Sequence, residues 1–171
     1  MRVIPLTVTA LAAALTLTAC GGDGGQSDKS SSSACEIGGV SVQIGSASVA
    51  PAAGDTGEVP VSITNHSAPC TLDHFPGASL SAGGAEVEVP VQQGAKAQKL
   101  KLAKGDSAMF TLSYVRGGAG GGSGLAAKTV KVSLPGSGTA RSFPWSYGPV
   151  AHKGASDAPD ASVSAFQQVG D

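Results

Sequence analysis

Apolar and polar residues alternate over several short stretches of this chain, and turn-forming residues separate these stretches. Alternation with a period of two is typical of a β-strand that buries one face. No stretch shows convincing apolar spacing for an amphipathic helix. The pattern therefore predicts an all-β domain, an antiparallel β-sandwich of seven to nine short strands. The main stretches are residues 40–44, 59–64, 78–80, 86–89, 98–102, 107–115 and 129–134.

The stretch from residue 65 to residue 77 interrupts the alternation, and the rest of the domain is organised around it. Asn65, Ser67 and Pro69 end the preceding strand in a turn, and Cys70 follows at once. Phe75-Pro76-Gly77 then forms a second corner. We expect the chain to leave one sheet here and to be tied across to another part of the molecule.

Other positions set the limits of the predicted strands. Pro60 has no amide donor, which places the start of its strand at a sheet edge. The nearly all-glycine stretch 117–124 is predicted to be a mobile hairpin connection, and the strand over 107–115 is predicted to be the longest. We assign the sandwich to residues 35–150. Residues 151–171 are either loose or add one short strand over 163–166.

Composition narrows the class of protein further. The chain has 171 residues with 25 Gly and 10 Pro, 13% charged and 4% aromatic residues, and a formal net charge of -1. Such a composition fits short strands joined by small-residue loops, with a core of Val, Leu and Ile. The near-neutral net charge gives no reason to predict nucleic-acid binding from the overall charge of the chain.

The first 19 residues have the features of a lipoprotein signal peptide. Met1-Arg2 is followed by an apolar run that is shorter than the roughly 20 residues of a membrane span. Leu17-Thr18-Ala19-Cys20 resembles the lipobox of bacterial lipoproteins. The resemblance implies cleavage before Cys20, diacylglycerol on its sulfur and an acyl group such as palmitate on its amine. An ordinary secretory signal with an incidental Cys20 is the alternative.

The lipoprotein interpretation predicts where the protein resides. Residues 20–34 are mainly Gly, Ser, Asp and Gln, so they form a lipidated, flexible tether. The domain would then stand on the extracellular face of the cytoplasmic membrane, anchored through Cys20. Its partners would be the membrane and either a cell-wall polymer or a surface protein.

Two further cysteines, Cys35 and Cys70, remain after Cys20. In an exported protein two such thiols usually pair, and closing a loop of about 35 residues stabilises the fold by about 3–4 kcal/mol. The competing interpretation is a copper or zinc site that uses Cys70 with His66 or His74. A disulfide at Cys70 would exclude a thiolate there.

Two sets of side chains are candidate binding surfaces. Lys99 and Lys101 form either a basic stripe for wall polyanions or the solvated face of an edge strand, where lysines discourage sheet association. Phe143, Trp145 and Tyr147 form either a sugar-stacking set or, through Trp145, a plug for an aromatic-poor core.

The sequence favours a protein that is not an enzyme and needs no cofactor. It contains three histidines and neither a G-x-S-x-G nor an H-E-x-x-H motif. Residues such as Ser67 and Asp73, near His66 and His74, are ordinary in turns. A non-catalytic interaction module is the preferred function, and metal binding or wall-polymer binding through Lys99 and Lys101 are the alternatives.

A resemblance to a known family rests on Cys35, on Asn65 with Pro69-Cys70-Thr71-Leu72, on Phe75-Pro76-Gly77-Ala78 and on Lys104-Gly105-Asp106-Ser107-Ala108. With these residues, the region from Cys35 to Leu134 resembles an actinobacterial exported and lipoprotein domain of unknown function, the DUF4232 family. The resemblance implies an immunoglobulin-like sandwich at the cell surface, with no established activity. Family members often carry further cysteines in the later half; this chain has none there, which leaves Cys35–Cys70 as the available bridge.

Overall fold

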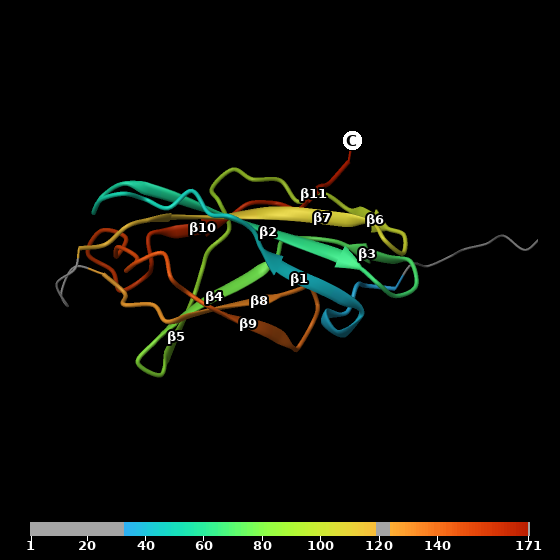
Figure 1. Ribbon diagram of the computed structural model, residues 1–171, viewed down its shortest axis with the longest axis horizontal. Coiled ribbons are helices and arrows are strands. Elements are labelled where there is room, and N and C mark those ends of the chain that lie inside the picture. The colour runs from blue at the N-terminus through green and yellow to red at the C-terminus, as the bar shows by residue number, and fades with distance from the viewer. Residues whose placement is uncertain (1–32, 119–123, 171) are drawn as a thin grey trace, which may run out of the picture. The chain divides into compact units, whose positions relative to one another are not determined.

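The computed structural model describes residues 33–118 and 124–170 of the chain. These residues form eleven β-strands and one short 3-10 helix, η1 (Ile37–Gly39), so the all-β prediction is confirmed (Figure 1). The strand number exceeds the predicted seven to nine because three-residue and two-residue strands give too little alternation to be recognised. No helix in the described part of the chain is long and apolar enough to cross a membrane. The signal segment, Cys20 and most of the tether lie outside the described residues.

The strands form two main sheets that face each other (Figure 1). The five-stranded sheet has the order β1 (Val40–Ile44), β2 (Thr56–Asn65), β7 (Ser107–Val115) and β10 (Ala161–Val163), with β11 (Gln167–Gln168) also paired to β7. The four-stranded sheet has the order β5 (Ala85–Glu88), β4 (Gly77–Ala82), β8 (Thr129–Ser133) and β9 (Ala140–Pro144). A separate pair consists of β3 (Cys70–Leu72) and β6 (Leu100–Leu102). Every one of these strand pairs is antiparallel.

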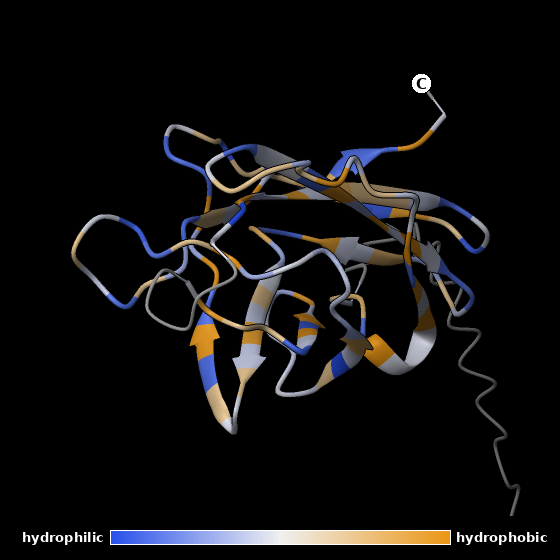
Figure 2. Ribbon diagram, turned by 60° about the vertical axis from the view of Figure 1, so that its left-hand side comes forward, coloured by the Kyte–Doolittle hydropathy of each residue, from blue (hydrophilic) through white to orange (hydrophobic). Residues whose placement is uncertain are grey.

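The core lies between the two main sheets. Alternate residues of β7 are buried, and Phe110, Leu112 and Tyr114 are each 1% exposed. From the opposite sheet, Val130 and Val132 of β8 belong to the same buried cluster. Figure 2 shows the resulting alternation of apolar and polar residues along the strands. The period of two in the sequence therefore identified correctly which faces turn inward. The longest strand, however, is β2 with 10 residues and not β7 with 9.

On the side away from β7, the start of β2 has no strand partner in the described residues, because β1 reaches only as far as Val61 and a single bridge joins Glu58 to Ser48. The edge expected from Pro60 is therefore confirmed for this side of the strand. Pro60 lies opposite Thr111 of β7, and its carbonyl accepts a hydrogen bond from the amide of Gly45. The amide and the carbonyl of Thr111 both bond to Ser164, on the side of β7 away from β2. The pairing of β2 with β7 therefore does not need an amide donor at Pro60. Pro60 is tolerated because β1 ends at Ile44, beside the position where its amide would have pointed.

The corner predicted around Asn65 is confirmed. Asn65 ends β2 and is fully buried, while its Nδ2 donates to the carbonyls of Ala68, Leu102 and Ala103. Its Oδ1 accepts from the amide and hydroxyl of Ser67. The chain then passes through β3 and enters β4 of the opposite sheet. One asparagine therefore joins the end of β2 to the turn before β3 and to the loop after β6.

The C-terminal segment is an ordered part of the sandwich as far as residue 170, and it adds two short strands where one over 163–166 was expected. β10 and β11 both pair with β7, and the residues between them bulge so that Phe166 enters the core. Phe166 is 0% exposed and packs edge-on against Phe110, with ring centroids 5.7 Å apart. The domain therefore extends beyond residue 150, to the end of the described chain.

Candidate functional site

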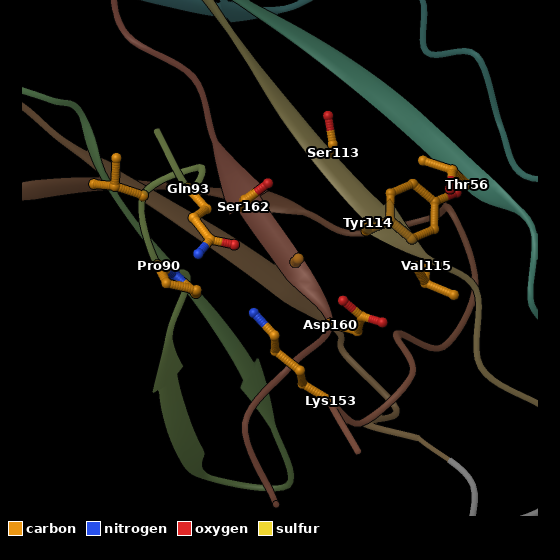
Figure 3. A pocket seen from close by; sticks show the side chains of 11 residues that line it. Thr56, Pro90, Gln93, Ser113, Tyr114, Val115, Lys153, Asp160 and Ser162 are labelled. Carbon is orange, nitrogen blue, oxygen red and sulfur yellow. The ribbon is translucent and has the colours of Figure 1, made fainter. Parts of the chain in front are cut away.

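A groove of about 530 Å³ lies on the outer face of the five-stranded sheet, at the β10 side (Figure 3). This volume is in the range of about 300–1,000 Å³ that is usual for small-ligand sites. Its polar lining comes from three strands and two loops: Thr56, Gln93, Ser113, Lys153, Asp160 and Ser162.

The strand register sets the floor of the groove. Ser113 of β7 lies opposite Ser162 of β10, and the ladder continues at Asp160, just before β10, whose carbonyl accepts a hydrogen bond from the Val115 amide. Thr56 of β2 lies opposite Val115 on the other side. Directly opposed Cβ atoms in an antiparallel pair are about 4.5–5.5 Å apart. Two serine hydroxyls therefore lie side by side, with the Asp160 carboxylate one step farther along the same face.

Two loops form the rim of the groove. Residues 90–92 run parallel to β10, where the Val163 amide donates to the Pro90 carbonyl and the Gln92 amide donates to the Val163 carbonyl. On the other side, Lys153 is held by a short hairpin through a 2.8 Å bond from its amide to the Ala158 carbonyl. Both rims are thus attached to the sheet framework by backbone hydrogen bonds, which favours a preformed site.

The polar side chains in the groove are not hydrogen-bonded to other protein groups in the described part of the chain. Ser113, Ser162 and Asp160 are half-buried, yet their side-chain oxygens have no protein partner there. Figure 3 shows the Lys153 ammonium and the Asp160 carboxylate as separate groups, and they form no ion pair. These groups are therefore available to a ligand or to water.

On the outer face of the four-stranded sheet, in contrast, three of the polar side chains bond to one another. The Ser79 hydroxyl donates to Glu86 Oε1 at 2.6 Å, and the Lys131 ammonium bonds to Glu86 Oε2. The bond from Lys131, followed by that from Ser79, lowers the pKa of Glu86 below its ordinary value. In the described residues, the groove lies on the outer face of the five-stranded sheet.

The two cysteines of the domain form the predicted disulfide. The bond joins Cys35 to Cys70, with their Cα atoms 4.9 Å apart, and both residues are buried. The chain next to Cys35 adds to β3, because the Cys35 amide donates to the Thr71 carbonyl and the Thr71 amide donates to the Ser33 carbonyl. The first described residues are therefore attached to the domain both covalently and by backbone bonds.

The disulfide also removes the ligand on which the metal interpretation depended. With Cys70 oxidised, its sulfur is not a thiolate that can bind copper or zinc. His66 Nε2 lies 2.9 Å from the Ser41 hydroxyl, and His74 pairs with Asp73 at an exposed position. Over residues 33–118 and 124–170, no three His, Cys, Asp or Glu side chains come together as a metal site.

Lys99 and Lys101 lie at β6, on the exposed side of the small β3–β6 sheet. Leu100 and Leu102 point inward, while both lysines face solvent. Lys99 also forms an exposed ion pair with Asp73 at 3.4 Å. This arrangement matches the solvated face of an edge strand. The lysines lie outside the outer-face groove.

The aromatic set is divided between core and surface. Trp145 is 6% exposed, and its ring packs edge-on against Tyr114 and Tyr147 at centroid distances of 5.1 and 4.9 Å. Its Nε1 donates to the Gly148 carbonyl. Burial and then the neighbouring Tyr114 raise the pKa of Tyr147. Trp145 therefore fills part of the core, as one interpretation predicted. The other interpretation, an exposed residue that stacks on sugars, is wrong for Trp145.

The groove residues were not singled out from the sequence. Alternation identifies Ser113 as an outward residue of its strand, but serine is ordinary at such positions. Ser162, Gln93 and Lys153 come from segments whose pairing with β7 or β10 is a long-range property. Alternation in the sequence therefore shows which residues of each strand point outward, but it does not give the strand register that brings these residues together.

Residues 35–167 match the model of a protein family described as a domain of unknown function (DUF4232). The chain belongs to this family. The match begins at Cys35 of the disulfide and ends at Gln167 of β11, so it includes the C-terminal strands. No curated protein and no solved structure matches the chain significantly. The DUF4232 chain thus has a family assignment that carries no activity with it.

Proposed function

We propose that this DUF4232 protein is a lipoprotein whose β-sandwich is a non-catalytic binding module of the cell envelope, anchored through Cys20 to the outer face of the cytoplasmic membrane. The observation that carries the proposal is the buried Cys35–Cys70 disulfide. Structural disulfides persist in oxidising compartments and are rare in the cytosol. The bridge therefore supports the export that the amino-terminal segment and its lipobox predict.

The attachment of the amino-terminal end supports anchoring through the tether. Ser33 and Cys35 are bonded to Thr71 of β3 only a short distance after the predicted lipidation site. A load on the tether would act on a disulfide and on the edge of a small sheet, not on a free end. This is a suitable arrangement for a domain held near a surface by its amino terminus.

The geometry around the histidines supports a binding role over catalysis. The Ser41 and His66 side chains are within hydrogen-bond distance of each other, but His66 is exposed and no described residue orients its other ring nitrogen. A nucleophile–base pair needs such an orienting group and a site for the reacting atom. The outer-face groove, in contrast, presents several polar groups without protein partners in the described residues, and these suit recognition.

The anchoring proposal is tested by replacing the lipidated cysteine. The full-length chain and its Cys20→Ser variant are expressed in a bacterium that processes lipoproteins, and both are followed by detergent phase partition and intact mass. We expect the parent chain in the detergent phase with the added mass of the lipid, and the variant in the aqueous phase.

The matched control is the Cys35→Ala/Cys70→Ala double variant, which changes cysteines but keeps Cys20. It should remain in the detergent phase. A Cys20→Ser chain that stays in the detergent phase, or a parent chain without lipid mass, would contradict anchoring through Cys20.

A further inference from the structure

We infer that the outer-face groove is the ligand site of the module and that it binds an uncharged oligosaccharide. This inference rests on the proposed function as a binding module and names the class of ligand. The observation behind it is the set of polar side chains in the groove that have no protein partner in the described part of the chain: Thr56, Gln93, Ser113, Lys153, Asp160 and Ser162.

The backbone of the groove floor is not available to a ligand. The β2–β7 and β7–β10 ladders pair the floor strands on both sides of β7, and the Val115 amide bonds to the Asp160 carbonyl. An extended peptide that adds to a sheet as a further strand needs free backbone groups at an edge. Recognition here must therefore depend on side chains, which argues against a peptide bound as an added strand.

The side chains of the floor and rim suit a ligand that is rich in hydroxyl groups. The Ser113 and Ser162 hydroxyls lie side by side and can each donate and accept. The Asp160 carboxylate accepts two hydrogen bonds in one plane, while the Gln93 amide both donates and accepts. Neighbouring hydroxyls on a sugar ring offer the same mixture of donors and acceptors in return. Val115 and Pro90 supply apolar contact area in the same groove.

The charges of the groove favour an uncharged ligand. Lys153 and Asp160 contribute one charge of each sign, and they are not paired with each other. Glu58, which lies opposite Ser113 on β2, adds a negative charge beside the groove. A polyanion would meet a single cation and two carboxylates, so its binding is disfavoured. Hydroxyl groups of the ligand can donate to the Asp160 carboxylate and accept from the Lys153 ammonium. Such charge-assisted hydrogen bonds need no charge on the ligand.

The size and rigidity of the groove fit a short oligosaccharide. Its volume of about 530 Å³ is that of a small-molecule site and far exceeds the space of a single ion. The serines project from paired strands, and both rims are attached by backbone hydrogen bonds. A ligand would therefore require little ordering of the backbone, while the exposed Gln93 and Lys153 side chains would be ordered on binding.

The test uses the full-length chain, purified in detergent and labelled with nitrogen-15. Three probes are added: the tetramer of N-acetylglucosamine, the β-linked tetramer of glucose, and polyglutamate. We expect at least one neutral tetramer to bind, shifting amide signals of β10 and of residues 90–93, and polyglutamate not to bind there. The Ser113→Ala/Ser162→Ala variant should weaken tetramer binding by about tenfold, because it removes two hydrogen bonds.

The control makes the same chemical change on the other sheet. Ser81→Ala/Ser142→Ala removes two outer-face hydroxyls from β4 and β9 and should leave tetramer affinity unchanged. Asp160→Asn keeps the shape of the groove and should also weaken binding by about tenfold.

The inference is overturned if neither tetramer binds, if the shifts lie away from the groove, if the groove variants bind as well as the parent, or if polyglutamate takes the groove. Because binding is measured on purified protein, it is independent of the partition of the Cys20→Ser variant. Failure of the oligosaccharide inference and failure of the anchoring proposal are thus distinguishable.

Discussion

Asn65 shows how one side chain joins distant parts of this fold. It is 0% exposed, yet all of its amide groups are used: Nδ2 by three carbonyls and Oδ1 by two donors of Ser67. Its own backbone amide and carbonyl bond to the turn at Gly105-Asp106. An apolar residue at this position would leave those carbonyls without their donor in a buried place. The polar identity of residue 65 is therefore a structural requirement.

Replacing Asn65 tests this requirement. We expect Asn65→Ala to lower the free energy of unfolding by about 2–4 kcal/mol, because several buried hydrogen bonds lose one partner. Urea unfolding under oxidising conditions measures the change. His66→Ala, at the exposed next position, is the control and should cost less than about 1 kcal/mol. Equal stability of the Asn65 variant and the parent would show that the corner is held by other contacts.

At the scale of elements, Glu86 connects three strands of the four-stranded sheet. Glu86 lies on β5, Ser79 on β4 and Lys131 on β8, so one carboxylate bridges across β4. The hydrogen bonds from Lys131 and Ser79 favour the ionised form and lower the pKa of Glu86. A lowered folded-state pKa stabilises the fold above the ordinary value of 4.5, and this stabilisation is lost as the pH falls through the folded-state pKa.

The Lys131→Ala variant tests this link between strands. Without the ammonium, the pKa of Glu86 should rise toward its ordinary value, and unfolding should depend less on pH in the acid range where Glu86 titrates. Carbon NMR of the Glu86 carboxyl follows the titration. Lys99→Ala, which removes a lysine that pairs with Asp73, should leave the titration of Glu86 unchanged. An unchanged pKa in the Lys131 variant would show that Ser79 alone holds the carboxylate.

At the scale of the whole domain, the C-terminal segment completes the five-stranded sheet. β10 and β11 pair with the edge of β7 that faces away from β2. The bulge between them inserts Phe166 into the core against Phe110. The groove also depends on this segment, since Asp160 and Ser162 line it. The same residues therefore close the core on one face and form the candidate site on the other.

Phe166→Ala tests whether this segment is part of the cooperative domain. We expect a loss of about 3–5 kcal/mol in unfolding free energy, the usual cost of removing a fully buried phenylalanine ring. Urea unfolding followed by tryptophan fluorescence reports on the core through Trp145. Val169→Ala is the control, because Val169 is 49% exposed, and it should cost less than about 1 kcal/mol. A small effect of Phe166→Ala would mean that the core is complete without the C-terminal strands.

The sequence by itself determined the class of fold and most of the inward faces. Alternation of apolar and polar residues is a local property with a period of two, and it marked β1, β2, β7 and β8 directly. The number of cysteines and the predicted export also led to the Cys35–Cys70 pair, because few pairings were possible. The corner at Asn65 was recognisable because its turn residues are close in sequence.

Only the tertiary structure decided which strands are neighbours and what their outer faces form together. Pro60 was placed at an edge from its missing donor, but only the structure shows that this edge arises where β1 ends and that β7 pairs the other side of β2. Whether the C-terminal residues are ordered depended on the unpaired side of β7, which lies far away in sequence. The groove arose in the same way, because Ser113 and Ser162 become neighbours through strand register, and register is set by long-range packing and not by local pattern.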